Sequence, residues 1–179
     1  MTAVSPTIST PTARPILHRS SGPMPDGVDL LAIAQGLAGS ATFRHGMTQT
    51  VERCWRTLAA TDRFEAFVIT WPVGGTIELH DHGPSAGAIV VASGSLVENS
   101  VGCAGDGTLF VTSASIPTGG YVVFESGHVH DIVNDGSEPA LSVHVYSPVL
   151  STMTYFDLVG DHRLVSLRTE SYGDGRVLQ

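Results

Sequence analysis

The chain has 179 residues, enough for one globular domain that buries a core without disulfides or a structural metal. Hydrophobic residues make up 42% and charged residues 15%, which excludes a disordered chain or a coiled coil. The formal net charge is -8 with no lysine, so we expect no affinity for nucleic acid or anionic membranes, and the two cysteines favour a reducing, cytoplasmic setting over a disulfide scaffold.

The N-terminal residues 1–25 are rich in Ser, Thr and Pro and are expected to form a disordered tail ahead of a single domain, 26–179. The longest apolar run in this tail is Ile16-Leu17. We therefore expect neither a signal-peptide core nor a membrane span there.

A short helix is predicted after the tail. Apolar residues recur at roughly helical spacing from Val28 to Leu37, Asp26 or Asp29 can cap the N-terminus, and Gly39 can end the helix.

After Thr48 the sequence changes to short runs of β-formers that are separated by Gly, Pro, Asp and Ser. The expected strands lie near 51–58, 64–71, 76–81, 86–92, 95–101, 108–113, 121–125, 129–134, 140–147 and 162–168. Turn markers such as Gly74-Gly75 and Asn134-Asp135-Gly136 provide the positive φ that tight hairpins need. This pattern predicts an all-β jelly-roll barrel with a short N-terminal helical segment.

Two His-x-His pairs indicate metal chemistry. His80 and His82 fall on one expected strand, where side chains alternate, so both rings face the same side and form half of a metal site. His128 and His130 fall on another, and antiparallel pairing can bring one of these rings opposite the first pair. The sequence assigns no role to His128, which either lines the mouth of a pocket or is a bystander.

The segment from Gly75 to His82, Gly94 twelve residues later and the glycine-led strand that ends in His130 resemble the two metal-binding motifs of the cupin superfamily. This resemblance implies a cupin fold and a metal held by His80, His82 and His130. Most cupins carry a glutamate ligand shortly after the first motif, but residues 83–93 contain no carboxylate. Three neutral imidazoles leave the charge of a divalent metal uncompensated and favour an anionic ligand.

The segment from Glu138 to Pro148 resembles the Ser-x-His-x-Tyr-Ser-Pro motif of the cysteine dioxygenases, the iron-dependent thiol dioxygenases of the cupin superfamily. Ser142, His144 and Tyr146 are two residues apart on one expected strand, so they share a face. The resemblance implies that they form a catalytic hydrogen-bonded relay that fixes the phenol near the metal.

The same resemblance, which spans roughly residues 54–157, implies an arginine for the substrate carboxylate. By its spacing Arg56 is the match, and Arg53 or Arg63 remain alternatives. Animal members also join a cysteine to the relay tyrosine, but that position is Gly87 here, so no such cross-link is expected.

The resemblance therefore implies an Fe(II)-dependent thiol dioxygenase that uses O2 to oxidise a small thiol, with L-cysteine converted to cysteine sulfinate as the leading reaction. Either 3-mercaptopropionate or another small thiol is an alternative substrate. Two other functions stay open, a zinc-dependent three-histidine hydrolase and a cupin binding module without turnover. The expected partners are a small thiol and O2, and the expected oligomeric state is a monomer or a weak homo-oligomer.

Overall fold

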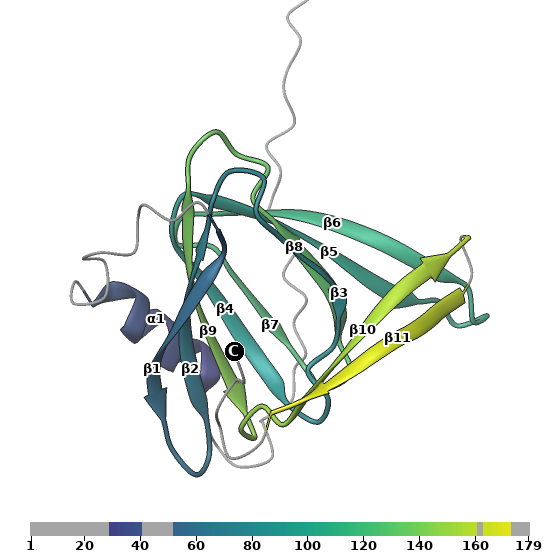
Figure 1. Ribbon diagram of the computed structural model, residues 1–179, viewed down its shortest axis with the longest axis horizontal. Coiled ribbons are helices and arrows are strands. Elements are labelled where there is room, and N and C mark those ends of the chain that lie inside the picture. Colours follow the sequence, from purple (N-terminus) through teal and green to yellow (C-terminus); the bar gives the residue numbers. More distant parts are fainter. Residues whose placement is uncertain (1–28, 41–51, 161–162, 173–179) are drawn as a thin grey trace, which may run out of the picture.

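The computed structural model describes residues 29–40, 52–160 and 163–172, and the expected tail, 1–25, lies outside them (Figure 1). These residues form the helix α1 (Leu30–Gly39) and the strands β1 (Cys54–Ala60), β2 (Glu65–Trp71), β3 (Thr76–His80), β4 (Ala86–Ser93), β5 (Ser95–Cys103), β6 (Leu109–Pro117), β7 (Tyr121–Phe124), β8 (Val129–Val133), β9 (Ala140–Ser147), β10 (Thr152–Val159) and β11 (Arg163–Ser171). Among the residues described, no helix has the length and hydrophobicity that crossing a membrane requires.

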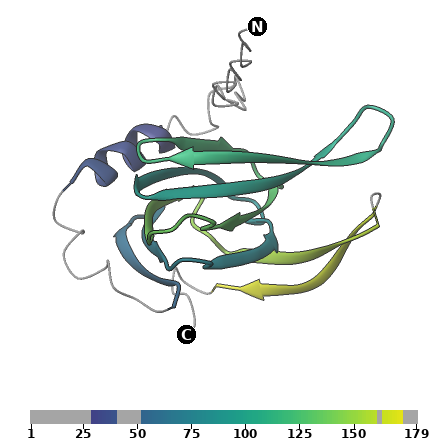
Figure 2. The same cartoon turned by 90° about the horizontal axis from the view of Figure 1, so that it is seen from above.

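The strands form two antiparallel sheets that face each other across one core. The five-stranded sheet has the order β1-β2-β9-β4-β7, and the six-stranded sheet has the order β11-β10-β3-β8-β5-β6. Figure 2 shows the β5–β6 and β10–β11 hairpins extending beyond the body of the barrel. The predicted all-β jelly roll with a short N-terminal helix is confirmed.

One strand, β10, is absent from the sequence prediction. Its signal is the alternation of buried Met153 and Tyr155 with more exposed neighbours. The strand pairs with β11 along its length and with β3 at Tyr155 and His80, so it adds a wall beside the histidines.

Helix α1 begins as the sequence predicts, with Asp29 as its N-cap. The Asp29 carboxylate accepts a hydrogen bond from the Ala32 amide at 2.9 Å, which satisfies one of the free amides of the first turn. The small residues Ala34 and Ala38 are buried against β4 and β9, so the helix covers the outer face of the five-stranded sheet (Figure 1).

The central strands β2, β4 and β9 of the five-stranded sheet are buried on both faces, and strand alternation decides which residues reach the site. In β9, Val143 and Val145 pack toward α1, whereas His144 and Tyr146 point to the inner face. The inner core between the sheets also contains Trp71 of β2. The polar residues of β9 and the histidines of β3 and β8 therefore share one interior space.

Candidate metal centre and its cavity

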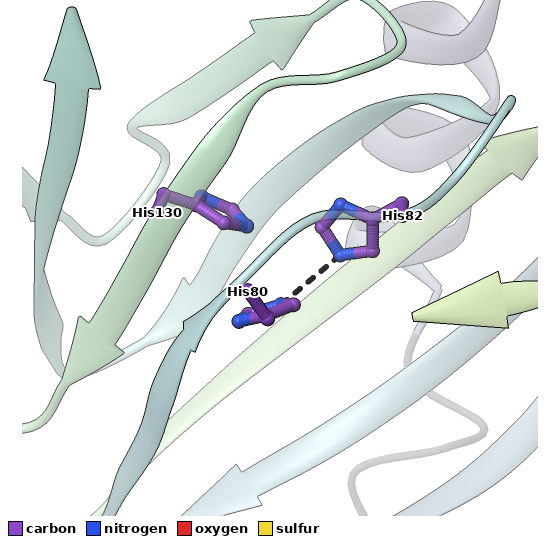
Figure 3. Close-up of side chains that lie close together, drawn as sticks. All are labelled: His80, His82 and His130. Carbon is purple, nitrogen blue, oxygen red and sulfur yellow. Dashed lines mark hydrogen bonds between the residues drawn. The ribbon is translucent and has the colours of Figure 1, made fainter. Parts of the chain in front are cut away.

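Three histidines meet inside the barrel (Figure 3). His80 is the last residue of β3, His82 follows two residues after it, and His130 of β8 pairs directly with His80 across the sheet. One ring nitrogen from each lies within 4.8 Å of the others, and the Nε2 atoms of His80 and His82 are 3.2 Å apart. All three side chains are 3% exposed or less. The structure thus brings the predicted metal ligands together.

The electrostatics of this cluster suit a metal. Burial and the neighbouring histidine charges lower the pKa values of His80 and His82 well below their usual range, and burial also lowers that of His130. The rings are therefore neutral at pH 7. Three convergent, neutral imidazoles fit a divalent cation.

Two of the three rings are oriented by hydrogen bonds. The Nδ1 of His80 lies 2.7 Å from the Glu78 carbonyl oxygen, and the Nδ1 of His130 lies 2.7 Å from Glu98 Oε1. Because a carbonyl and a carboxylate oxygen only accept, both Nδ1 atoms donate. The Nε2 atoms of these two rings are left for a metal.

The third ring, His82, is held by aromatic contacts. Its Nδ1 is buried and has no hydrogen-bond partner among the described residues. It stacks on Phe124, with centroids 5.0 Å apart and planes 21° apart, and lies 4.8 Å from the Tyr146 ring. The opposite face of Phe124 carries His128 at 5.2 Å and 16°.

Phe124 occupies the space beside Gly87. A Cβ atom added at Gly87 would lie 2.3 Å from Cζ of the Phe124 ring. The position from which some cysteine dioxygenases form their cross-link thus lacks a thiol, and a ring fills the space next to it.

Glu98 is a residue of this centre that the sequence analysis missed. It lies in β5, is 4% exposed, and its Oε1 is 2.7 Å from His130 Nδ1 and 3.0 Å from His128 Nε2. Burial alone raises the pKa of the Glu98 carboxyl, but the hydrogen bonds from His128 and His130 outweigh it and lower the pKa to about 2. The sequence signal is the alternation in β5, where Leu96, Glu98 and Ser100 face inward.

A second chain of polar groups ends at Tyr146. Trp71 Nε1 is 2.8 Å from Ser142 Oγ, which is 2.8 Å from His144 Nε2, and His144 Nδ1 is 3.1 Å from the Tyr146 hydroxyl. The structure brings Ser142, His144 and Tyr146 together as alternation along β9 predicts. Trp71 extends their chain by one member.

Both titratable members of this chain are uncharged at neutral pH. Burial, with the nearby charge of His130, lowers the pKa of His144 to about 3. Burial raises the pKa of the Tyr146 phenol well above its usual range. His144 is therefore a neutral imidazole, and Tyr146 keeps its proton.

These groups surround a cavity of about 90 Å³, which suits a molecule of a few heavy atoms. Its walls are mostly apolar or aromatic, and its polar groups are the three ligands, His144, Arg53 and several tyrosines. The lining residues are Arg53, Trp55, Phe67, Ile69, Trp71, Ile77, His80, His82, His130, Ile132, His144, Tyr146, Leu150, Met153, Tyr155 and Tyr172. Arg53 is the one arginine among the described residues of this lining.

The structure places Arg56, the residue predicted to bind the substrate carboxylate, outside this cavity. Arg56 pairs with Val68, whose side chain packs on the outer side of the five-stranded sheet, and Arg56 is exposed. Arg53 lies just before β1 and points to the inner side, with its Cζ 5.5 Å from the centre of the Trp71 ring. Residues an odd number of positions apart on a strand face opposite sides, so the two arginines cannot share the cavity. Arg63, the other alternative, is exposed and absent from the lining.

His128 borders a different space. It is half-buried and lines a second cavity of about 630 Å³ on the other side of Phe124, together with Glu98 and Ser100. It does not line the cavity of the three histidines. His128 also belongs to a second close group, with Glu98 and His130, whose 2.7 and 3.0 Å separations are hydrogen-bond lengths.

Comparison with known proteins gives the chain a family context. The family model described as cysteine dioxygenase type I matches residues 39–159. Similar solved structures include TT1209 from Thermus thermophilus, with 17% identity over 56% of this chain and 88% of that one and a TM-score of 0.48. A double-stranded β-helix protein from Klebsiella pneumoniae is 24% identical over 56% and 75%, with a TM-score of 0.46. A cupin sugar phosphate isomerase from Silicibacter pomeroyi is 21% identical over 59% and 66%, with a TM-score of 0.48. The likeness to these structures is one of fold and does not extend to their reactions.

Proposed function

Because the chain belongs to the cysteine dioxygenase type I family, we propose that it is an Fe(II)-dependent thiol dioxygenase that oxidises a small carboxylated thiol, foremost L-cysteine, with O2. One observation carries the proposal. Three neutral imidazoles, a protonated phenol and an arginine line the same small cavity.

The proposed reaction converts R–SH and O2 into R–SO2H. Both oxygen atoms are transferred to sulfur, which is oxidised by four electrons while O2 is reduced by four, so no other reductant is needed. Iron held by His80, His82 and His130 supplies the redox chemistry that activates O2 toward the thiol. The remaining steps are binding, orientation and proton control by the protein.

Arg53 binds the substrate carboxylate in this proposal. A guanidinium offers a carboxylate two parallel hydrogen bonds, and the low polarity of the surrounding walls strengthens them. The Trp71 ring beside the Arg53 guanidinium limits where that group can lie. The carboxylate is thus fixed at one end of the cavity, and the thiol extends toward the histidines.

Tyr146 donates a hydrogen bond into the cavity. Trp71 only donates, so Ser142 accepts from it, and we propose that Ser142 directs its own hydrogen to His144 Nε2. His144 then carries its proton on Nδ1 and donates to the Tyr146 oxygen. The phenolic hydrogen is left to stabilise negative charge that develops on the oxygen being transferred.

The walls of the cavity are mostly apolar. Phe67, Ile69 and Ile132 surround the polar groups and lower the local dielectric. The two cysteines of the chain, Cys54 and Cys103, are free, which agrees with a reducing cytoplasm where small thiols and Fe(II) persist.

The test is oxygen uptake by iron-loaded protein with L-cysteine, 3-mercaptopropionate and cysteamine, combined with product mass and with metal analysis after anaerobic purification. We expect iron, one O2 consumed per thiol and a sulfinate product with L-cysteine. A protein that holds zinc and hydrolyses substrates without O2 would support the hydrolase instead. A protein that has intact iron sites but consumes no O2 with any of these thiols would be a binding module instead.

A further inference from the structure

Glu98 is a buried acid that touches one predicted metal ligand, His130, and one histidine outside the cavity, His128. The geometry points to Glu98 as the positioning residue of the metal centre: it fixes the proton of His130 on Nδ1 and supplies the negative charge that the three ligands lack. His128 acts as the second donor that holds this carboxylate in place. The inference rests on the metal site of the proposed function and not on its reaction.

The position of the His130 proton follows from which of the contacting atoms can donate a hydrogen bond. An ionised carboxylate has no hydrogen to give, so the 2.7 Å contact with His130 Nδ1 requires that nitrogen to donate. The lone pair of His130 is then on Nε2, the atom left to face His80 and His82. Without an acceptor at Nδ1, the proton could move to Nε2 and block the metal.

The negative charge of Glu98 matters because the metal ligands are buried. The ligands are three neutral imidazoles, so a divalent cation there would keep its full charge in a site almost closed to water. Glu98 is 4% exposed and hydrogen-bonded to the ligand His130. Its charge therefore acts through the imidazole and makes Nε2 of His130 a stronger electron-pair donor to a metal.

His128 completes the arrangement from the side of the second cavity. Its Nε2 donates to the same Oε1 atom at 3.0 Å, and its ring is fixed by stacking on Phe124 at 5.2 Å. Two charge-assisted donors on one oxygen hold the carboxylate where it is and offset the cost of burying it. His128, to which the sequence assigned no role, therefore orients Glu98, and Glu98 in turn orients the ligand His130.

The first test measures Zn(II) affinity by chelator competition in the full-length protein, a readout that requires no turnover. Glu98→Gln keeps the shape but removes the charge and presents an amide hydrogen, so we expect the affinity to fall about 10–100-fold. Glu98→Asp, which restores the charge on a shorter stem, should recover part of it. Glu65→Gln is the matched control, because Glu65 is also buried but bonds the Leu150 amide rather than a ligand.

Unchanged Zn(II) affinity in Glu98→Gln, or an equal loss in Glu65→Gln, would overturn the inference.

The second test avoids substitution in case a variant does not fold. Nitrogen-15 spectra of histidine-labelled, Zn(II)-loaded protein should show His130 protonated on Nδ1 and His128 protonated on Nε2. A proton on His130 Nε2 or a metal on His130 Nδ1 would exclude the arrangement. A protein that binds zinc in this way but oxidises no thiol would refute the proposed function alone.

Discussion

Trp71 and Ser142 are joined by a 2.8 Å hydrogen bond whose direction is fixed, because an indole nitrogen can only donate. The bond links β2 to β9 inside the core and occupies one lone pair of the Ser142 hydroxyl. In the proposed relay the Ser142 hydrogen points to His144 Nε2, His144 donates from Nδ1, and the phenolic hydrogen of Tyr146 faces the cavity.

Replacing Tyr146 by Phe tests this chain. The ring still packs on His82 and Phe67, so we expect metal content to stay near the wild-type value. The hydroxyl donor is lost, so kcat should fall about 100-fold. Oxygen uptake and metal analysis measure both. Full activity of the variant would show that the relay has no catalytic part. For the wild-type protein, a single intact mass without a cross-link is expected after turnover, because position 87 has no thiol.

Loss of any one ligand tests the metal centre. His80→Ala, His82→Ala and His130→Ala should each reduce metal affinity by more than the about 10–100-fold that outer-shell changes cost. His128→Ala should retain most of the metal, because His128 is not a ligand and Glu98 keeps its hydrogen bond to His130. Metal content per chain after dialysis provides the measurement. Full occupancy in His130→Ala would remove that residue from the ligand set.

The two arginines near β1 give a paired test of substrate binding. Arg53→Ala should cost about 2–4 kcal/mol in kcat/KM for L-cysteine, the range for losing a buried charge-assisted pair, and little for cysteamine, which has no carboxylate. Arg56→Ala, on the exposed side of the same strand, is the control and should change kcat/KM little for either thiol. The reverse ranking of the two variants would assign the carboxylate to Arg56.

The stability of the metal-free protein should fall as the pH falls below about 6.5. The pKa of His144 is about 3 in the folded protein and 6.5 in its ordinary state, so between these values the unfolded chain binds a proton that the folded chain does not. The free energy of unfolding should drop by about 2 kcal/mol from this residue alone between pH 7.5 and pH 5.

Denaturant unfolding of the wild type and of His144→Gln at both pH values measures that contribution. The variant should be less stable at each pH but less dependent on pH, because it lacks the titrating ring. An equal dependence on pH in both proteins would mean that His144 is not a neutral buried imidazole in the folded state.

Alternation along single strands made much of this site predictable. The spacing of Ser142, His144 and Tyr146 is a property of one strand, so it could be read without knowing any partner strand. The ligand pair His80 and His82 was expected on one strand as well. In the structure β3 ends at His80, and His82 reaches the same space from the segment that follows.

The parts that were missed depend on where a strand begins or on which strands pair. Arg53 and Arg56 are separated by an odd number of positions, so choosing between them required the register of β1 against β2, which a β-bulge also interrupts. Glu98 reaches His130 only because β5 pairs with β8, placing Ser100 opposite His130. Such long-range register is not encoded in local periodicity.

The packing of Phe124 over Gly87 couples these two positions. A side chain at position 87 would collide with the Phe124 ring where it now lies, and the same ring supports His82 and His128. A cysteine beside Tyr146 would therefore require this ring to move, and that movement would disturb the stacking on two histidines. Conversion of the uncross-linked site into a cross-linked one thus involves position 124 as well as position 87.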